Sequence, residues 1–108
     1  MSLTFTVISG AVPSTLGETV TFNFGLPSVP KGGKGYLFYM VDTREGNHAY
    51  RVVMNGNTEC KIALPSGNNF ATLNTAVGHL GRANVLSFES DGVGPPVDIL
   101  NVALFWEQ

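Results

Sequence analysis

The chain has little charge and no cluster of basic residues. Charged residues make up 13% of its 108 residues, which is about half of the ~25% usual for globular proteins. The net charge is −2, and the six Lys and Arg residues are spread along the chain. Because nucleic-acid binding relies on clustered positive charge, no nucleic-acid partner is expected. Low charge also favours self-association, since copies of the chain repel one another weakly.

The chain also lacks cysteine pairs and long hydrophobic segments. Cys60 is the only cysteine, so no intrachain disulfide can form, which fits a reducing cytoplasm. We expect it to be a buried, unreactive thiol. No apolar run approaches the ~20 residues that cross a bilayer, and no signal-peptide pattern follows Met1. At this length the chain is expected to be one domain, 1–108.

No motif for catalysis or metal binding is present. The only histidines, His48 and His79, have no His or Cys neighbour at a spacing typical of metal ligands. No local signature marks one serine as a nucleophile. Asp91 and Asp98 are the only obvious oxygen ligands for calcium, which takes about six or more, so calcium stays an alternative. We therefore expect a chain that is not an enzyme and has no catalytic residue, no cofactor and no metal ligand.

Hydrophobic and polar residues alternate along much of the chain, which is typical of β-strands. In the clearest case, residues 19–25, the side chains of Val20, Phe22 and Phe24 are expected to point inward. Asn55-Gly56 predicts a tight hairpin, because a type I′ turn needs positive φ at both central residues. These patterns predict about eight strands, over residues 3–8, 19–25, 36–41, 50–54, 59–64, part of 70–80, 85–89 and 97–106.

Two of these strands have apolar faces whose surroundings the sequence leaves open. Leu3, Phe5 and Val7 share one face of the first strand. The run YLFYMV at 36–41 is apolar at every position, so it is either a central strand covered on both faces or a strand whose outer face meets a partner. Loops are expected between the strands, among them one over 10–17. The whole pattern predicts an antiparallel sandwich or barrel.

The order of strands and turns resembles that of a known family. Four segments carry the resemblance: VVMNG at 52–56, Leu64-Pro65, LGRANVLSF at 80–88, which has one change of spacing, and ILNVAL at 99–104. Similar segments recur in the galactose-binding-domain-like jelly rolls, a group that includes many carbohydrate-binding modules. The resemblance covers roughly residues 20–106 and implies an antiparallel jelly-roll β-sandwich of two sheets. Within it, Asn84 is expected to bond backbone groups after the turn at Gly81.

This resemblance implies a non-catalytic ligand-binding module, with carbohydrate as the expected partner. Sugar rings present apolar C–H faces that stack on aromatic rings, and their hydroxyls need polar partners. Tyr36 and Tyr39 are an odd number of residues apart, so they point to opposite faces of one strand, and at least one reaches the outside. An aromatic would stack on the sugar, while polar residues around the polar turn expected over 42–47 bind its hydroxyls. The predicted site residues are Tyr36, Tyr39, Arg44, Asn47, His48, Tyr50 and Arg51.

The alternative is a structural or assembly protein that forms a homo-oligomer or part of a larger particle. The apolar strand over 36–41 and the apolar final strand would both serve a subunit interface. A lectin-like module that oligomerises to gain avidity would combine the two functions. For Trp106, closure of the sandwich is the favoured expectation.

Overall fold

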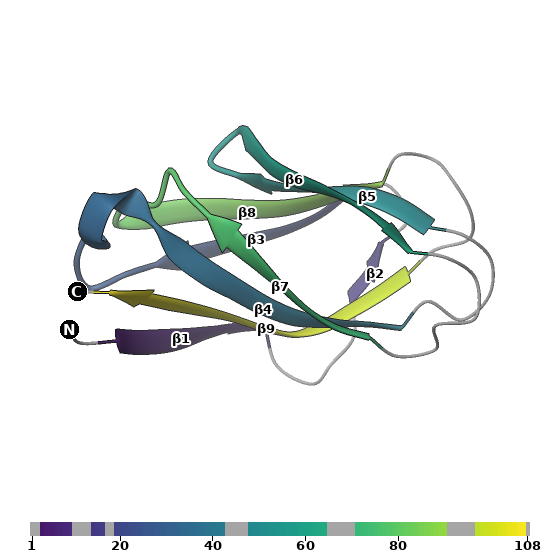
Figure 1. Ribbon diagram of the computed structural model, residues 1–108, viewed down its shortest axis with the longest axis horizontal. Coiled ribbons are helices and arrows are strands. Elements are labelled where there is room, and N and C mark those ends of the chain that lie inside the picture. Colours follow the sequence, from purple (N-terminus) through teal and green to yellow (C-terminus); the bar gives the residue numbers. More distant parts are fainter. Residues whose placement is uncertain are drawn as a thin grey trace.

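The computed structural model describes residues 3–9, 14–16, 19–42, 48–64, 71–90 and 97–107, which form two antiparallel sheets (Figure 1). The larger sheet has the strand order β1-β9-β4-β7, with β2 also paired to β9, and the smaller has the order β3-β8-β5-β6. This confirms the predicted all-β class with two antiparallel sheets. The elements are β1 (Leu3–Ser9), β2 (Ser14–Leu16), β3 (Thr19–Gly25), the 3₁₀ turn η1 (Lys31–Gly33), β4 (Gly35–Asp42), β5 (His48–Met54), β6 (Asn57–Leu64), β7 (Ala71–Val77), β8 (Ala83–Ser90) and β9 (Val97–Glu107).

Alternating side chains decide which face of a strand is buried. Along β3, the side chains of Val20, Phe22 and Phe24 pack against the core, while the residues between them are exposed. The predicted inward set is therefore confirmed. Within the described residues no helix is long and apolar enough to cross a membrane.

The hairpin between β5 and β6 forms at the predicted residues. Asn55 has φ of 50° and Gly56 has φ of 82°, the positive values that a type I′ turn needs. The Asn55 side chain donates to the carbonyl of His79 at 2.8 Å and accepts from the Val85 N–H at 2.8 Å. These bonds tie the hairpin to the connection between β7 and β8.

Asn84 orders that connection as predicted. Its side-chain oxygen accepts from the Gly81 N–H at 2.8 Å, and its amide donates to the Gly81 carbonyl at 2.9 Å. The same oxygen accepts from the Asn55 amide at 2.9 Å. Buried polar groups need such partners, so this asparagine anchors both the turn and the hairpin.

The expectation of a loop over 10–17 is wrong for residues 14–16, which form β2. They pair with residues 97–99 of β9, and no local pattern reveals so distant a partner. The expected short strand within 70–80 is confirmed as β7. The expected break at 91–96 lies outside the described residues.

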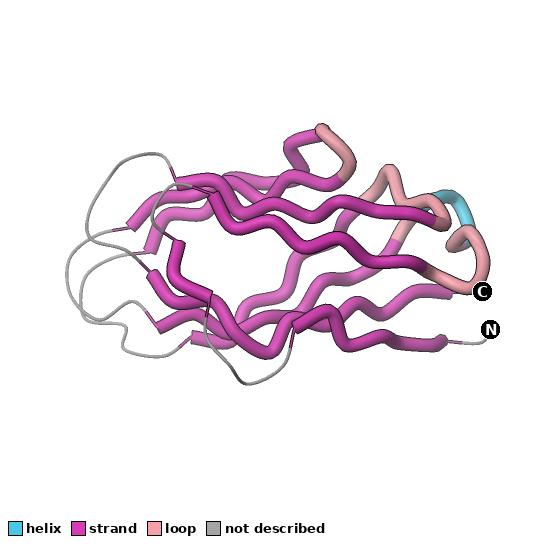
Figure 2. Tube along the Cα trace, turned by 180° about the vertical axis from the view of Figure 1, so that it is seen from behind, coloured by secondary structure: helices cyan, strands magenta, loops and turns pink. Residues whose placement is uncertain are grey.

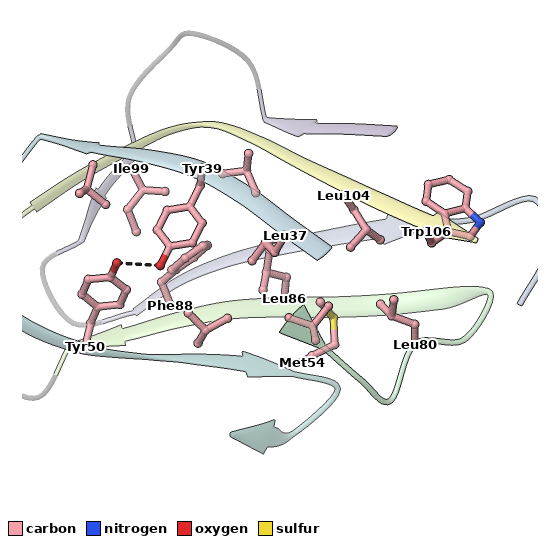
Figure 3. Close-up of a cluster of buried hydrophobic side chains, with 14 of the residues drawn as sticks. Leu37, Tyr39, Tyr50, Met54, Leu80, Leu86, Phe88, Ile99, Leu104 and Trp106 are labelled. Carbon is pink, nitrogen blue, oxygen red and sulfur yellow. Dashed lines mark hydrogen bonds between the residues drawn. The ribbon is translucent and has the colours of Figure 1, made fainter. Parts of the chain in front are cut away.

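The core fills the space between the two sheets. Figure 3 shows side chains of both sheets meeting there. The ring of Phe88 from the smaller sheet packs 4.9 Å from that of Tyr39 in the larger sheet. Trp106 lies at one end and is only 2% exposed, so it closes the sandwich as expected.

Candidate functional site

Two of the predicted sugar-stacking residues are buried in the core. Tyr39 is 1% exposed and Tyr50 is fully buried. Their hydroxyl oxygens lie 2.7 Å apart, so one donates a hydrogen bond to the other across the two sheets (Figure 3). The expectation that either ring is available to a sugar is wrong, because the inward face of each strand is closed by the opposite sheet.

Burial also sets the acidity of this tyrosine pair. Removal from water raises the pKa of Tyr39 to about 12, because the phenolate would lose its hydration. Burial raises the pKa of Tyr50 further, and the neighbouring Tyr39 hydroxyl adds to the effect. Both side chains are therefore neutral near pH 7, and they act as a polar bridge inside the core.

Tyr36 is the predicted aromatic that the structure exposes. It is 57% exposed on the outer face of the larger sheet, opposite in direction to Tyr39, as the odd spacing predicted. It lies near the start of β4, however, whereas residues 43–47 come after the last residue of that strand in the sequence. In the sequence, the rest of β4 therefore lies between Tyr36 and the predicted turn on which the predicted site was centred.

Of the remaining predicted residues, Arg51 is the one whose side chain the structure describes, and it does not join Tyr36. Arg51 lies on the smaller sheet, where its guanidinium donates to the Glu89 carboxylate at 2.9 Å. The backbone of His48 begins β5, and its side chain lies outside the described residues, as do Arg44 and Asn47. Because Arg51 and Tyr36 belong to different sheets and face away from the core, the seven residues do not form one cluster.

The structure instead places Tyr36 at a pocket that the sequence did not reveal. The pocket has a volume of about 330 Å³ and is lined by residues at the start of β4 and at the ends of β7 and β9. Figure 2 shows η1, in cyan, at the same end of the sandwich as the C-terminus. We call this pocket the end pocket. It is lined by Lys31, Lys34, Gly35, Tyr36, Ala76, Val77, Trp106 and Glu107.

A short turn positions the two lysines of the end pocket. The Gly33 N–H donates to the Pro30 carbonyl at 2.9 Å, and the Gly33 carbonyl accepts from the Leu80 N–H at 2.9 Å. These bonds fix η1 against the connection that follows β7. Gly35 then starts β4 so close to its neighbours that an added Cβ would lie 2.9 Å from the Phe105 carbonyl oxygen. A side chain there would push β4 away and deform the pocket floor.

Charged and polar groups lie beside the exposed ring. The Lys31 ammonium is 3.7 Å from the Glu107 carboxylate, and Lys34 lines the same pocket. The buried indole N–H of Trp106 has no hydrogen-bond partner among the described residues. Figure 3 shows this nitrogen on the side of the ring away from Leu104. The end pocket thus combines an accessible ring, two cations and a carboxylate, while the Trp106 N–H is buried.

Neither histidines nor carboxylates gather into a metal site in the described part of the chain, where no group of three or more His, Cys, Asp or Glu residues is found. His79 is exposed and its Nδ1 lies 3.0 Å from the Glu59 carboxylate. Cys60 is half-buried against the core, less covered than expected, and its thiol is 3.7 Å from the Thr75 hydroxyl. Asp98 is buried, and Asp91 lies outside the described residues.

The comparisons with known proteins give the fold. No family model and no curated protein matches the chain. The CBM36-1 domain of a multidomain xylanase from the hindgut metagenome of Trinervitermes trinervoides is similar to it, with a TM-score of 0.67 and 9% identity over 99% of this chain and 98% of that one. A variant of the family 29 carbohydrate-binding module CBM29-2 is similar with a TM-score of 0.63 and 16% identity, over 99% and 88% of the two chains.

Another match is dimeric latent PorU from Porphyromonas gingivalis, with a TM-score of 0.70 and 10% identity. It covers 96% of this chain but 12% of that one, so this chain corresponds to a small part of that protein. These likenesses confirm the jelly-roll fold shared with carbohydrate-binding modules, as the sequence resemblance implied. Since fold does not determine ligand, the function must be argued from the site.

Proposed function

We propose that this protein is a non-catalytic carbohydrate-binding module whose site is the end pocket. The observation that carries the proposal is the exposed ring of Tyr36 beside Lys34 and Glu107 in one pocket. An apolar ring that lies next to a few fixed polar groups is the usual composition of a sugar site. The fold, shared with modules named for carbohydrate binding, supports the same class of ligand.

Each group would have a separate task. The ring of Tyr36 stacks on the C–H face of a sugar, which removes apolar surface from water on both sides. The Lys34 ammonium donates to sugar hydroxyl oxygens, and the Glu107 carboxylate accepts from hydroxyl protons. None of these tasks moves a proton or breaks a bond.

The test combines a glycan array with calorimetry on the glycan that binds best. Replacement of Tyr36 by Ala removes the stacking ring and should weaken affinity about tenfold or more, equivalent to about 1.4 kcal/mol. Phe38→Ala is the matched control, because Phe38 lies on the same face of β4 but does not line the pocket. Unchanged affinity in Tyr36→Ala, or no glycan bound by the unsubstituted protein, would contradict the proposal.

A second arm of this experiment tests the turn predicted from the sequence. Arg44, Asn47 and His48 stay candidate contacts for a sugar at the turn that the sequence predicts over 42–47. Arg44→Ala should leave affinity unchanged if the end pocket is the site. If Arg44→Ala weakens binding and Tyr36→Ala does not, the sugar binds at the turn instead. Arg51 is less suited to a sugar, because it already bonds Glu89.

A further inference from the structure

The outer face of the larger sheet carries an exposed group of aromatic and aliphatic side chains. Register places Phe5 of β1 beside Phe105 of β9, and Phe105 beside Tyr36 of β4. In the next row Val7 neighbours Ala103, which neighbours Phe38. We call Phe5, Val7, Phe38, Ala103 and Phe105 the outer aromatic face; Tyr36 lies at its border with the end pocket.

These side chains contact one another but are not covered by the chain. The ring of Phe105 stacks on that of Phe5 at 5.4 Å and meets Phe38 edge to face at 5.1 Å. Even so, Phe5 is 60% exposed and Val7 is 62% exposed. Tyr36 is 57% exposed and Phe38 is 36% exposed, so of the two interpretations of residues 36–41, coverage on both faces within the chain is wrong, and contact with a partner remains.

The face is also free of charge in the part of the chain that the structure describes. Its flanking outward positions on β4, β7 and β9 carry amide, hydroxyl, thioether or methyl groups, whereas Lys31, Lys34 and Glu107 line the end pocket next to it. Interface centres are typically rich in aromatic residues and poor in charge. The flanking residues are Met40, Thr72, Asn74, Ala76 and Asn101.

From these observations we infer that the outer aromatic face is the interface of a homodimer, in which a second copy of the chain covers it. A two-fold axis brings one patch against its own copy, so any charge in the patch risks meeting a like charge. Among its described residues this face has no charged side chain, so two copies of it can meet without repulsion between like charges. A net charge of −2 also adds little repulsion between copies. The proposed interface adjoins the proposed sugar site at Tyr36, but the inference does not depend on sugar binding.

A sugar fits this face less well than a protein does. The five side chains of the face offer no hydrogen-bond donor or acceptor, whereas sugar sites need placed polar groups for the hydroxyls. The polar groups of this end of the molecule are in the end pocket instead. The two surfaces therefore match different occupants.

Sedimentation velocity with light scattering, over a concentration series of the whole chain, tests the inference. The unsubstituted protein should form a closed dimer. Phe5→Lys or Val7→Lys should weaken that dimer about 100-fold or more, because each places an unpaired charge in the interface. Val85→Lys is the matched control on the smaller sheet, where Val85 is likewise an exposed strand residue, and it should leave the dimer unchanged. Circular dichroism of each variant checks that it folds.

Several outcomes would overturn the inference. A protein that stays monomeric up to millimolar concentration has no such interface, and open-ended aggregates would exclude a closed two-fold contact. If Val85→Lys breaks the dimer while Phe5→Lys and Val7→Lys leave it intact, the interface lies on the smaller sheet. If the protein is monomeric and Phe5→Lys loses glycan affinity, the face binds sugar. If the unsubstituted protein is a dimer and Phe5→Lys is a monomer that keeps its glycan affinity, the dimer interface and the sugar site are separate surfaces.

Discussion

The two sheets have similar inner faces and very different outer faces. On the smaller sheet, the outward positions carry polar and charged groups, such as the Arg51–Glu89 ion pair and the contact between the hydroxyls of Thr21 and Ser87 at 3.3 Å. On the larger sheet, the same positions carry Phe5 and its aromatic neighbours. An antiparallel sheet that faces water on one side normally has polar residues there. The smaller sheet therefore has the composition of a solvated surface, and the larger sheet that of a contact surface.

The largest expected effect comes from the inner faces. Phe88 is fully buried and packs against the rings of Tyr39 and Tyr50, so Phe88→Ala should destabilise the fold by about 3–5 kcal/mol. Phe38→Ala on the outer aromatic face removes a partly exposed ring and should cost the monomer less than about 1 kcal/mol. Urea unfolding of both variants, in dilute solution, measures the difference. Equal losses would mean that the outer ring is part of the core, and the contrast between the faces would fail.

An intermediate effect on stability is expected from the buried Tyr39–Tyr50 pair, which joins the two inner faces. The pKa of Tyr39 is raised from about 10 in the unfolded chain to about 12 in the fold, so between these values the folded state keeps a proton that the unfolded state loses. The free energy of unfolding is therefore unaffected by Tyr39 below about pH 10 and decreases as the pH rises above that value. At pH 12 the decrease from Tyr39 alone is about 2 kcal/mol. Tyr50, whose pKa is also raised, adds to the loss.

Urea unfolding at a series of alkaline pH values checks this expectation. A double variant, Tyr39→Phe with Tyr50→Phe, lacks both hydroxyls and should lose the part of the pH dependence that begins near the ordinary tyrosine pKa. The exposed Tyr36→Phe variant serves as the control and should keep it. If the double variant shows the same alkaline loss as the unsubstituted protein, the buried pair is not its cause.

The smallest expected effect is on the polar outer face. Arg51 and Glu89 lie 2.9 Å apart with both side chains partly exposed, and such pairs contribute about 0.2–1 kcal/mol. A double-mutant cycle with Arg51→Gln and Glu89→Gln isolates that value from the other contacts of Arg51, and added salt should reduce it. A coupling well above this range, and insensitive to salt, would show that the smaller sheet is less solvated than its composition indicates.

The sequence predicted the fold well where the pattern was local. Alternation along β3 gave the buried side chains, and Asn55-Gly56 gave the hairpin, because each depends on residues that are near in the chain. For the first strand, alternation predicted correctly that Phe5 and Val7 share one face. It did not predict whether that face points to the core or to the outside. The answer depends on register with β9, at the other end of the sequence.

The candidate site was much harder to predict. Nearness in sequence suggested a cluster around the predicted turn at 42–47, yet Tyr36 lies near the start of β4 on the outer face and Tyr50 is buried in the core. The end pocket joins Lys34 to Glu107 and Trp106, which are about 70 residues further along the chain. Only sheet topology brings them together, and no motif in the sequence records it.

The central place of β9 has a consequence for how the chain is made. Strands β1, β2 and β4 all pair with β9, which is the last of the described strands to leave the ribosome. The smaller sheet consists of β3, β5, β6 and β8 and can assemble earlier. Until β9 is made, β1 lacks its partner strand and its apolar side chains stay exposed. Completion of the larger sheet is therefore a late event of biosynthesis, and a nascent chain paused before β9 would present β1 to chaperones.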